Sequence, residues 1–291
     1  MRILILGSKG IVGNAIFRSL KNKFIYELNS NSYEYKKNTY KLNKFKPCDY
    51  FVHAAGVTEE EINKYGVKSA KIRSSHSLKK LLLNLINKGC KNFVYISSMR
   101  VYKENVQIID ENKTLIDLNS SYKICHFLAE KEFKVLALNY SANCLILRPG
   151  AVYGFPAKGK RNNRMSLIPY SFPYALFKNK KIILKTSGDQ FRNFISNNDI
   201  AIRVKKWVNM KKKELIISNV KGDKTMTVKD FAKLCIKIYK NKTNFKTKLE
   251  FKKSKEKFKR IKIHQNLNIK NKDKINFFIN KFFNQLMYFK N

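Results

Sequence analysis

Three glycines near the start of the chain are spaced for binding a phosphate group. Gly7, Gly10 and Gly13 follow an apolar run over residues 2–6 and open a stretch of helical character over 14–22. In such a loop the first glycine permits a tight turn, the second lets the backbone approach a pyrophosphate, and the third lets helix and strand pack closely. The helix N-terminus attracts negative charge. Because the loop joins a strand to a helix, we expect it to bind a dinucleotide through Gly7, Ser8, Lys9, Gly10, Ile11, Val12 and Gly13.

The elements that must position this loop alternate between strands and helices. Short apolar runs typical of buried parallel strands occupy residues 2–6, 24–28, 49–53, 93–96 and 143–147. Helical spacing of apolar residues covers 14–22, 68–88 and 122–136. This alternation predicts an α/β fold of the Rossmann type, a doubly wound parallel sheet with a smaller interwoven C-terminal substrate domain.

The second half of the chain is less regular, and prolines interrupt it. We expect residues 1–154 to form the dinucleotide-binding domain, with 188–220 returning to it, and residues 155–187 and 221–291 to form the smaller substrate-binding portion. The lysine-rich end of the chain carries an apolar stripe at helical spacing, formed by Ile275, Phe278, Ile279, Phe282 and Leu286. Docking of this stripe on the protein is favoured over binding to a membrane surface.

The composition restricts the choice of partner and compartment. A net charge of +41 would ordinarily suggest nucleic acid, but lysine is spread along the chain and no base-stacking motif or helix-turn-helix stands out. We therefore expect no specific nucleic-acid partner. Five widely spaced cysteines without a C-x-x-C pair predict neither a disulfide framework nor a metal site. No signal peptide or membrane-spanning run is recognisable, so a cytoplasmic location is expected.

The glycine spacing resembles that of the extended short-chain dehydrogenases/reductases, which include the NAD-dependent epimerase/dehydratase family. The segment His53-Ala54-Ala55-Gly56 also resembles the family, in which it runs beside the cofactor, NAD or NADP. The resemblance therefore implies that Ala54, Ala55 and Gly56 contact the cofactor. A carboxylate ending the second strand would favour NAD. Asn29 stands near that place, so the choice between NAD and NADP stays open.

Two further segments resemble the family's catalytic residues. Residues 94–102 resemble a strand end at which a serine hydrogen-bonds the reacting oxygen of the substrate, and Ser98 takes that role. The family's Tyr-x-x-x-Lys motif pairs an acid/base tyrosine with an activating lysine. Here it reads Tyr122-Lys-Ile-Cys-His126, so His126 replaces the lysine and is expected to orient Tyr122 and the cofactor ribose, although its positive charge is lost near neutral pH. Lys123 follows Tyr122 directly and so lies about 100° around the helix from it. Its side chain is expected to be a solvated surface charge.

The resemblance continues through residues 147–154, which match the family's strand and loop leading into its substrate domain, and through residues 188–201. Arg192 stands where an arginine of the family meets the diphosphate of a nucleotide-sugar, which implies bidentate phosphate binding. Family dehydratases carry Thr-Asp-Glu where this chain has Ser98-Met99-Arg100, so dehydration is disfavoured.

Two reactions and one non-catalytic role remain open. Epimerisation recycles a bound NAD, whereas reduction of a keto-sugar consumes NADPH, and the fold does not choose between them. Without the lysine, the protein is also compatible with a cofactor-binding scaffold or regulator that has lost turnover. The resemblance further implies a homodimer that pairs the helices predicted at 68–88 and 122–136.

Overall fold

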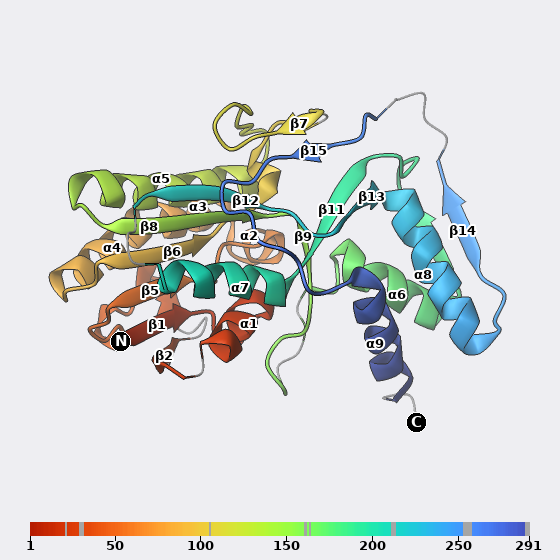
Figure 1. The fold of residues 1–291 in the computed structure, drawn as a ribbon, viewed down its shortest axis with the longest axis horizontal. Coiled ribbons are helices and arrows are strands. Elements are labelled where there is room, and N and C mark those ends of the chain that lie inside the picture. Colours follow the sequence, from red (N-terminus) through yellow and green to blue (C-terminus); the bar gives the residue numbers. More distant parts are fainter. Residues whose placement is uncertain are drawn as a thin grey trace.

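Six parallel strands form the central sheet of the protein (Figure 1). The structure, a computed structural model, describes residues 1–20, 22–28, 32–104, 106–159, 162, 164–210, 214–252 and 258–288. Across the sheet the strands follow the order β12 (Ile216–Val220), β8 (Asn143–Pro149), β6 (Asn92–Ile96), β5 (Tyr50–His53), β1 (Arg2–Leu6) and β2 (Phe24–Leu28). The predicted Rossmann-type fold is therefore confirmed.

The order of the strands determines where a ligand binds. From β1 the chain moves outward to β2 and then returns past β1 to β5, so the direction of winding reverses between β1 and β5. In open parallel sheets, ligands bind at this switch point, outside the carboxyl ends of the strands. Gly7 follows β1 and Ala54 follows β5, so the two segments expected at the cofactor meet there.

Helices cover both faces of the sheet. Alternate side chains of β1 explain why both faces are apolar: Ile3 and Ile5 join one buried cluster, and Leu4 and Leu6 join the other. The first cluster packs under α1 (Ile11–Ser19) and α7 (Asn197–Val208). The second packs under α4 (His76–Asn87) and α5 (Ser121–Asn139). This burial of both faces is the reason that the strands read as continuous apolar runs.

One predicted helix is two helices. The helical pattern over 68–88 divides into α3 (Val67–Ser74) and α4, because Ser75 has φ −124° and ψ −94°, which is not a helical conformation. The first helix also begins earlier than predicted, at Ile11, and ends at Ser19.

A second, smaller group of elements lies beyond the carboxyl ends of the sheet (Figure 1). It contains a three-stranded sheet of β13 (Lys224–Thr227), β11 (Phe191–Ser196) and β9 (Ala151–Tyr153), and a two-stranded sheet of β10 (Lys181–Leu184) and β14 (Lys248–Phe251). Its helices are α6 (Ile168–Asn179), α8 (Val228–Thr243) and α9 (Ile275–Tyr288). Pro169 and Pro173 do not interrupt α6 but lie within it.

The apolar stripe near the C-terminus docks on this smaller group, as predicted. Ile275, Phe278, Ile279 and Phe282 of α9 are buried against side chains of α6 and α8. The membrane-surface alternative for this stripe therefore loses its support, because its apolar face is already covered.

The lysine-rich segment before α9 crosses back to the main sheet, which the sequence did not indicate. There β15 (Lys262–Ile263) pairs with β7 (Ile108–Ile109), and Leu267 is buried in the core under α7. The Asn266 side-chain amide donates to the carbonyl of Ile217 in β12. The C-terminal segment thus ties the two groups of elements together.

Among the helices in the described ranges, none is both long and apolar enough to cross a membrane.

Candidate active site

A cavity of about 1430 Å³ lies at the carboxyl ends of the central strands. The glycine loop and the residues after β5 line one part of it, and the residues after β6 and the start of α5 line another. The segment after β9 and the side chain of Arg192 close it on the side of the smaller group. One continuous space therefore joins the expected cofactor residues to the expected catalytic and phosphate-binding residues.

The glycine loop has the geometry that close approach by a ligand requires. Gly7 has φ +90°, a conformation that L side chains rarely adopt. A Cβ on Gly13 would lie 2.0 Å from the Gly7 carbonyl oxygen, so only glycine allows α1 to pack this close to the loop. Gly10 caps α1 without a side-chain hydrogen bond, and no acidic residue stands in the first turn. This helix start suits a pyrophosphate.

The loop residues divide into those that face the cavity and those that support it. Gly7, Lys9, Gly10, Ile11 and Val12 line the cavity. Ser8 is buried and does not line it, and Gly13 acts through packing on Gly7.

The Ala54-Ala55-Gly56 segment lies against the glycine loop. A Cβ on Gly7 would stand 3.0 Å from the Ala54 carbonyl, and all three residues line the cavity. A Cβ on Gly56 would lie 2.9 Å from Cε1 of His126, so glycine at this position leaves room for the imidazole. His53, just before this segment, is buried.

A cluster that the sequence did not suggest lies at the end of the cavity beyond β2. Arg73 donates to Glu61 at 2.6 Å, to the Tyr35 hydroxyl at 2.5 Å and to the Ala55 carbonyl at 2.9 Å. Tyr35 stacks on Tyr65 with ring centroids 3.6 Å apart. Asn29, the residue expected at the adenosine ribose, lies outside the described residues.

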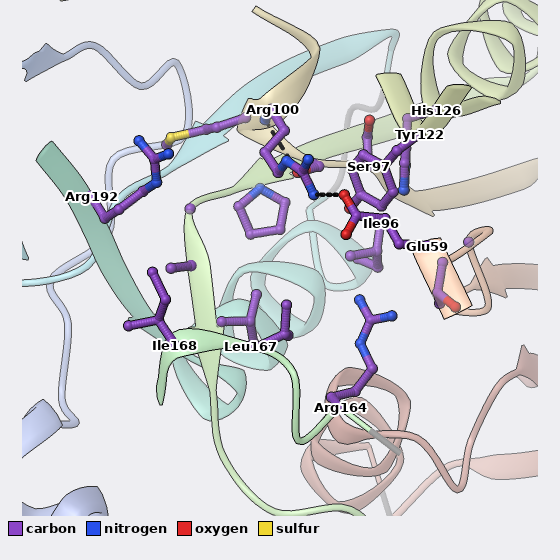
Figure 2. A pocket seen from close by; sticks show the side chains of 18 of the residues that line it. Glu59, Ile96, Ser97, Arg100, Tyr122, His126, Arg164, Leu167, Ile168 and Arg192 are labelled. Atoms are coloured by element: carbon purple, nitrogen blue, oxygen red, sulfur yellow. Dashed lines mark hydrogen bonds and ion pairs between the residues drawn. The ribbon is translucent and has the colours of Figure 1, made fainter. Parts of the chain in front are cut away.

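Ser98, Tyr122 and His126 all line the cavity. Figure 2 shows the Tyr122 and His126 side chains next to each other. Ser98 precedes the turn η3 (Met99–Val101), and its Oγ accepts a hydrogen bond from the Arg100 backbone at 3.2 Å. Tyr122 is in the first turn of α5, and the ring centroids of Tyr122 and His126 are 4.5 Å apart. The spacing of four residues thus places both rings on one face of the helix.

His126 is a neutral residue in this environment. Burial lowers the pKa of His126 to about 4, and the positive charges of Arg164 and Arg100 act in the same direction against the opposite effect of Glu130. Its Nδ1 lies 2.8 Å from the hydroxyl oxygen of Tyr95. At neutral pH, His126 therefore does not carry the positive charge that the missing lysine would supply.

The expectation for Lys123 is wrong. Its side chain is buried and its ammonium lies 2.7 Å from Asp117 Oδ2. Lys123 is therefore held in an ion pair at the side of α5. The helical pattern of α5 could not predict this pair, because Asp117 belongs to the loop before the helix.

A buried polar network holds the segment after β6 in place. Ser97 donates to Glu130 at 2.6 Å, and Arg148 pairs with Glu130 through Nε at 2.8 Å and Nη2 at 2.5 Å. Arg148 also donates to the Tyr102 hydroxyl, which donates to Asn219. This network anchors the residues on both sides of Ser98 to α5, β8 and β12.

Besides Arg73, three arginines line the cavity from different segments (Figure 2). Arg100 pairs with Glu59 at 2.7 Å, and Arg164 pairs with Glu60 at 3.2 Å. Arg192 makes one hydrogen bond, to the Phe191 carbonyl, and within the described part of the chain it forms no ion pair, although the charge of Glu104 acts on it at longer range. Its guanidinium is therefore available to an anion.

The fold and the glycine loop define a dinucleotide-binding protein of the Rossmann type. The model of the NAD dependent epimerase/dehydratase family matches residues 3–215, and the chain belongs to this family. No curated protein sequence matches the chain significantly.

Solved structures share the fold over nearly the whole chain. UDP-glucuronic acid 4-epimerase from Bacillus cereus in complex with NAD is 17% identical with a TM-score of 0.77, covering 98% of this chain and 96% of that chain. RMD from Pseudomonas aeruginosa complexed with NADPH is 16% identical with a TM-score of 0.78, covering 99% of each. UDP-N-acetylglucosamine 4-epimerase from Methanobrevibacter ruminantium M1 in complex with UDP-N-acetylmuramic acid is 17% identical with a TM-score of 0.77, covering 99% and 98%.

Proposed function

We propose that the protein is an NAD-dependent epimerase of a nucleotide-activated sugar. The observation that carries this proposal is that one cavity contains the glycine loop, the Ser98 and Tyr122 side chains and the guanidinium of Arg192, which forms no ion pair with the described residues. The glycine loop suits a dinucleotide, Ser98 and Tyr122 suit a reacting sugar, and Arg192 suits a diphosphate. The reaction requires all three in one connected space.

The residues at the switch point fit a dinucleotide. The glycine loop would hold its pyrophosphate at the start of α1, and Ala54, Ala55 and Gly56 would lie along it. NAD held by these residues would supply reversible hydride transfer with the sugar. His126, held by Tyr95 and neutral, would orient the ring of Tyr122 and offer a polar edge to the cofactor ribose.

Tyr122 and Ser98 would act on the sugar. The phenolic oxygen of Tyr122 would take the proton of the reacting hydroxyl as the carbon loses its hydride, and would return it afterwards. Ser98 would hydrogen-bond the same oxygen, because its Oγ is fixed at the start of η3 beside the cavity. Arg192 would bind the diphosphate, and this anchoring would place the sugar between the two halves of the cavity.

Contacts across the cavity favour a retained cofactor and hence epimerisation. The backbone amide of Ala157 donates to the Lys9 carbonyl at 3.3 Å, which joins the segment after β9 to the glycine loop. Further along the same segment, Ser166 donates to Glu60 at 2.6 Å. These contacts oppose release of a bound dinucleotide, as suits an enzyme that returns the hydride to its own substrate.

Reduction of a keto-sugar with NADPH is the second candidate. Lys9 favours it, because this cation lines the cavity from the glycine loop and, within the described ranges, has no acidic partner. A lysine there is suited to the extra phosphate of NADPH.

Incubation of the purified protein with UDP- and dTDP-hexoses and catalytic NAD tests the proposal, with inversion at C4 followed by proton NMR. Inversion that disappears in Tyr122→Phe would establish an epimerase. NADPH oxidation with a 4-keto sugar, without inversion, would instead establish the reductase. If dinucleotide binds and neither reaction occurs, the protein is a scaffold or regulator of this fold.

A further inference from the structure

We propose that Arg100 is a positioning residue whose guanidinium supplies the positive charge beside Tyr122 that the family's lysine would supply. This inference rests on the proposed role of Tyr122 as the acid/base. It assigns to Arg100 a task that neither the sequence motif nor the family pattern attaches to this position.

The guanidinium of Arg100 lies over the ring of Tyr122. Its Cζ is 4.4 Å from the ring centroid, within the range of a cation–π contact. A cation at this distance stabilises a phenolate more than a neutral phenol, because the Coulomb attraction acts on the anion. A positive charge over the face of the ring can therefore stabilise the Tyr122 phenolate, as a lysine ammonium one helical turn away would.

The backbone links Arg100 to the other proposed catalytic residue. Arg100 donates its amide hydrogen to Ser98 Oγ at 3.2 Å, and both residues belong to the turn that follows β6. The buried Ser97–Glu130–Arg148 network holds this turn against α5. The position of the guanidinium over Tyr122 is thus determined by the same turn that presents Ser98.

The other charged or titratable groups near Tyr122 do not supply this charge. His126, whose ring contacts Tyr122, is buried and neutral, and Tyr95 faces it with an uncharged hydroxyl. Lys123 is paired with Asp117 on another side of the helix. Arg164 pairs with Glu60 as Arg100 pairs with Glu59, but among the described residues it is the Arg100 guanidinium that lies over the Tyr122 ring.

Glu59 moderates and orients the Arg100 charge. Its carboxylate lies 2.7 Å from Nη1 of Arg100, and both side chains are about half exposed, at 56% and 49%. A solvent-exposed pair of this kind contributes little to stability. Removing the Arg100 charge should therefore leave the fold intact, which makes the residue testable.

The test compares Arg100→Met with Arg100→Lys in the apo protein. Ultraviolet difference titration of each variant against the same variant carrying Tyr122→Phe reports formation of the Tyr122 phenolate alone. We expect Arg100→Met to move phenolate formation upward by roughly half to one pH unit, and Arg100→Lys to recover most of that shift, because it keeps the charge. Circular dichroism over the same pH range checks that each variant stays folded.

An unchanged titration in Arg100→Met, or equal shifts in both variants, would overturn the inference. Because the titration needs no turnover, it separates this inference from the proposed reaction. If the parent also epimerises a sugar, the rising limb of its kcat–pH profile should shift in Arg100→Met and return in Arg100→Lys, with KM little changed.

Discussion

The imidazole of His126 and the hydroxyl of Tyr95 form a buried pair, with Nδ1 and the phenolic oxygen 2.8 Å apart. Tyr95 belongs to β6 and His126 to α5, so this contact joins a central strand to the helix that carries Tyr122. It also places His126 away from solvent, where burial favours the neutral ring.

The stability of the protein should fall in mild acid because of this histidine. The pKa of His126 is lowered from 6.5 to about 4 by burial, so between these values the unfolded chain binds more protons than the folded one. The free energy of unfolding therefore decreases as the pH falls through this window, by up to about 3 kcal/mol for His126. Urea unfolding at a series of pH values measures this loss.

His126→Gln should flatten that dependence, whereas the exposed His76→Gln should not. His53, also buried with its pKa lowered to about 3, should contribute a similar loss that persists in His126→Gln. Identical pH dependence in the parent and His126→Gln would show that the imidazole does not titrate as its burial requires.

Arg192→Ala should weaken binding of a nucleoside diphosphate. A guanidinium without an acidic partner contributes charge-assisted hydrogen bonds to a phosphate, and their loss should raise Kd roughly tenfold to a hundredfold. Isothermal titration calorimetry with UDP measures the change. Arg18→Ala, at an exposed position outside the cavity, is the matched control, and equal weakening in both variants would mean that only the net charge matters.

Glu130→Gln should destabilise the fold strongly. The carboxylate is fully buried and pairs with buried Arg148, which would keep its charge without a counter-ion. A loss of about 3–5 kcal/mol in the free energy of unfolding is expected. Glu132→Gln on the same helix, which breaks no ion pair of the described residues, should change it by less than about 0.5 kcal/mol. Replacing both partners, Glu130→Leu with Arg148→Met, should recover part of the loss.

A homodimer through α4 and α5 remains an expectation of the family resemblance. The apolar side chain of Leu138, near the end of α5, is 75% exposed and offers a contact on this face. Light scattering should give a dimer for the parent at micromolar concentration and a monomer for Leu138→Lys. Ile183→Lys, at an exposed apolar site in β10, should remain dimeric. A monomeric parent would contradict the expectation.

Local patterns in the sequence were sufficient for the central fold. The apolar runs in the first half of the chain predicted five of the six strands of the central sheet. The glycine spacing placed the glycine loop between β1 and α1. The four-residue spacing of Tyr122 and His126 placed both on one face of α5. Each of these features depends on residues close together in the chain, and periodicity reports such features directly.

The tertiary structure alone decided which charges pair and which stay free. Arg100 lies over Tyr122, Lys123 is buried against Asp117, Arg164 pairs with Glu60, and Arg192 forms no ion pair with the residues that the structure describes. The return of the lysine-rich segment to β12 was likewise invisible in its composition. In a chain with 61 lysines and arginines against 20 acidic residues, each carboxylate has many possible partners. Only the packing of distant segments selects one of them.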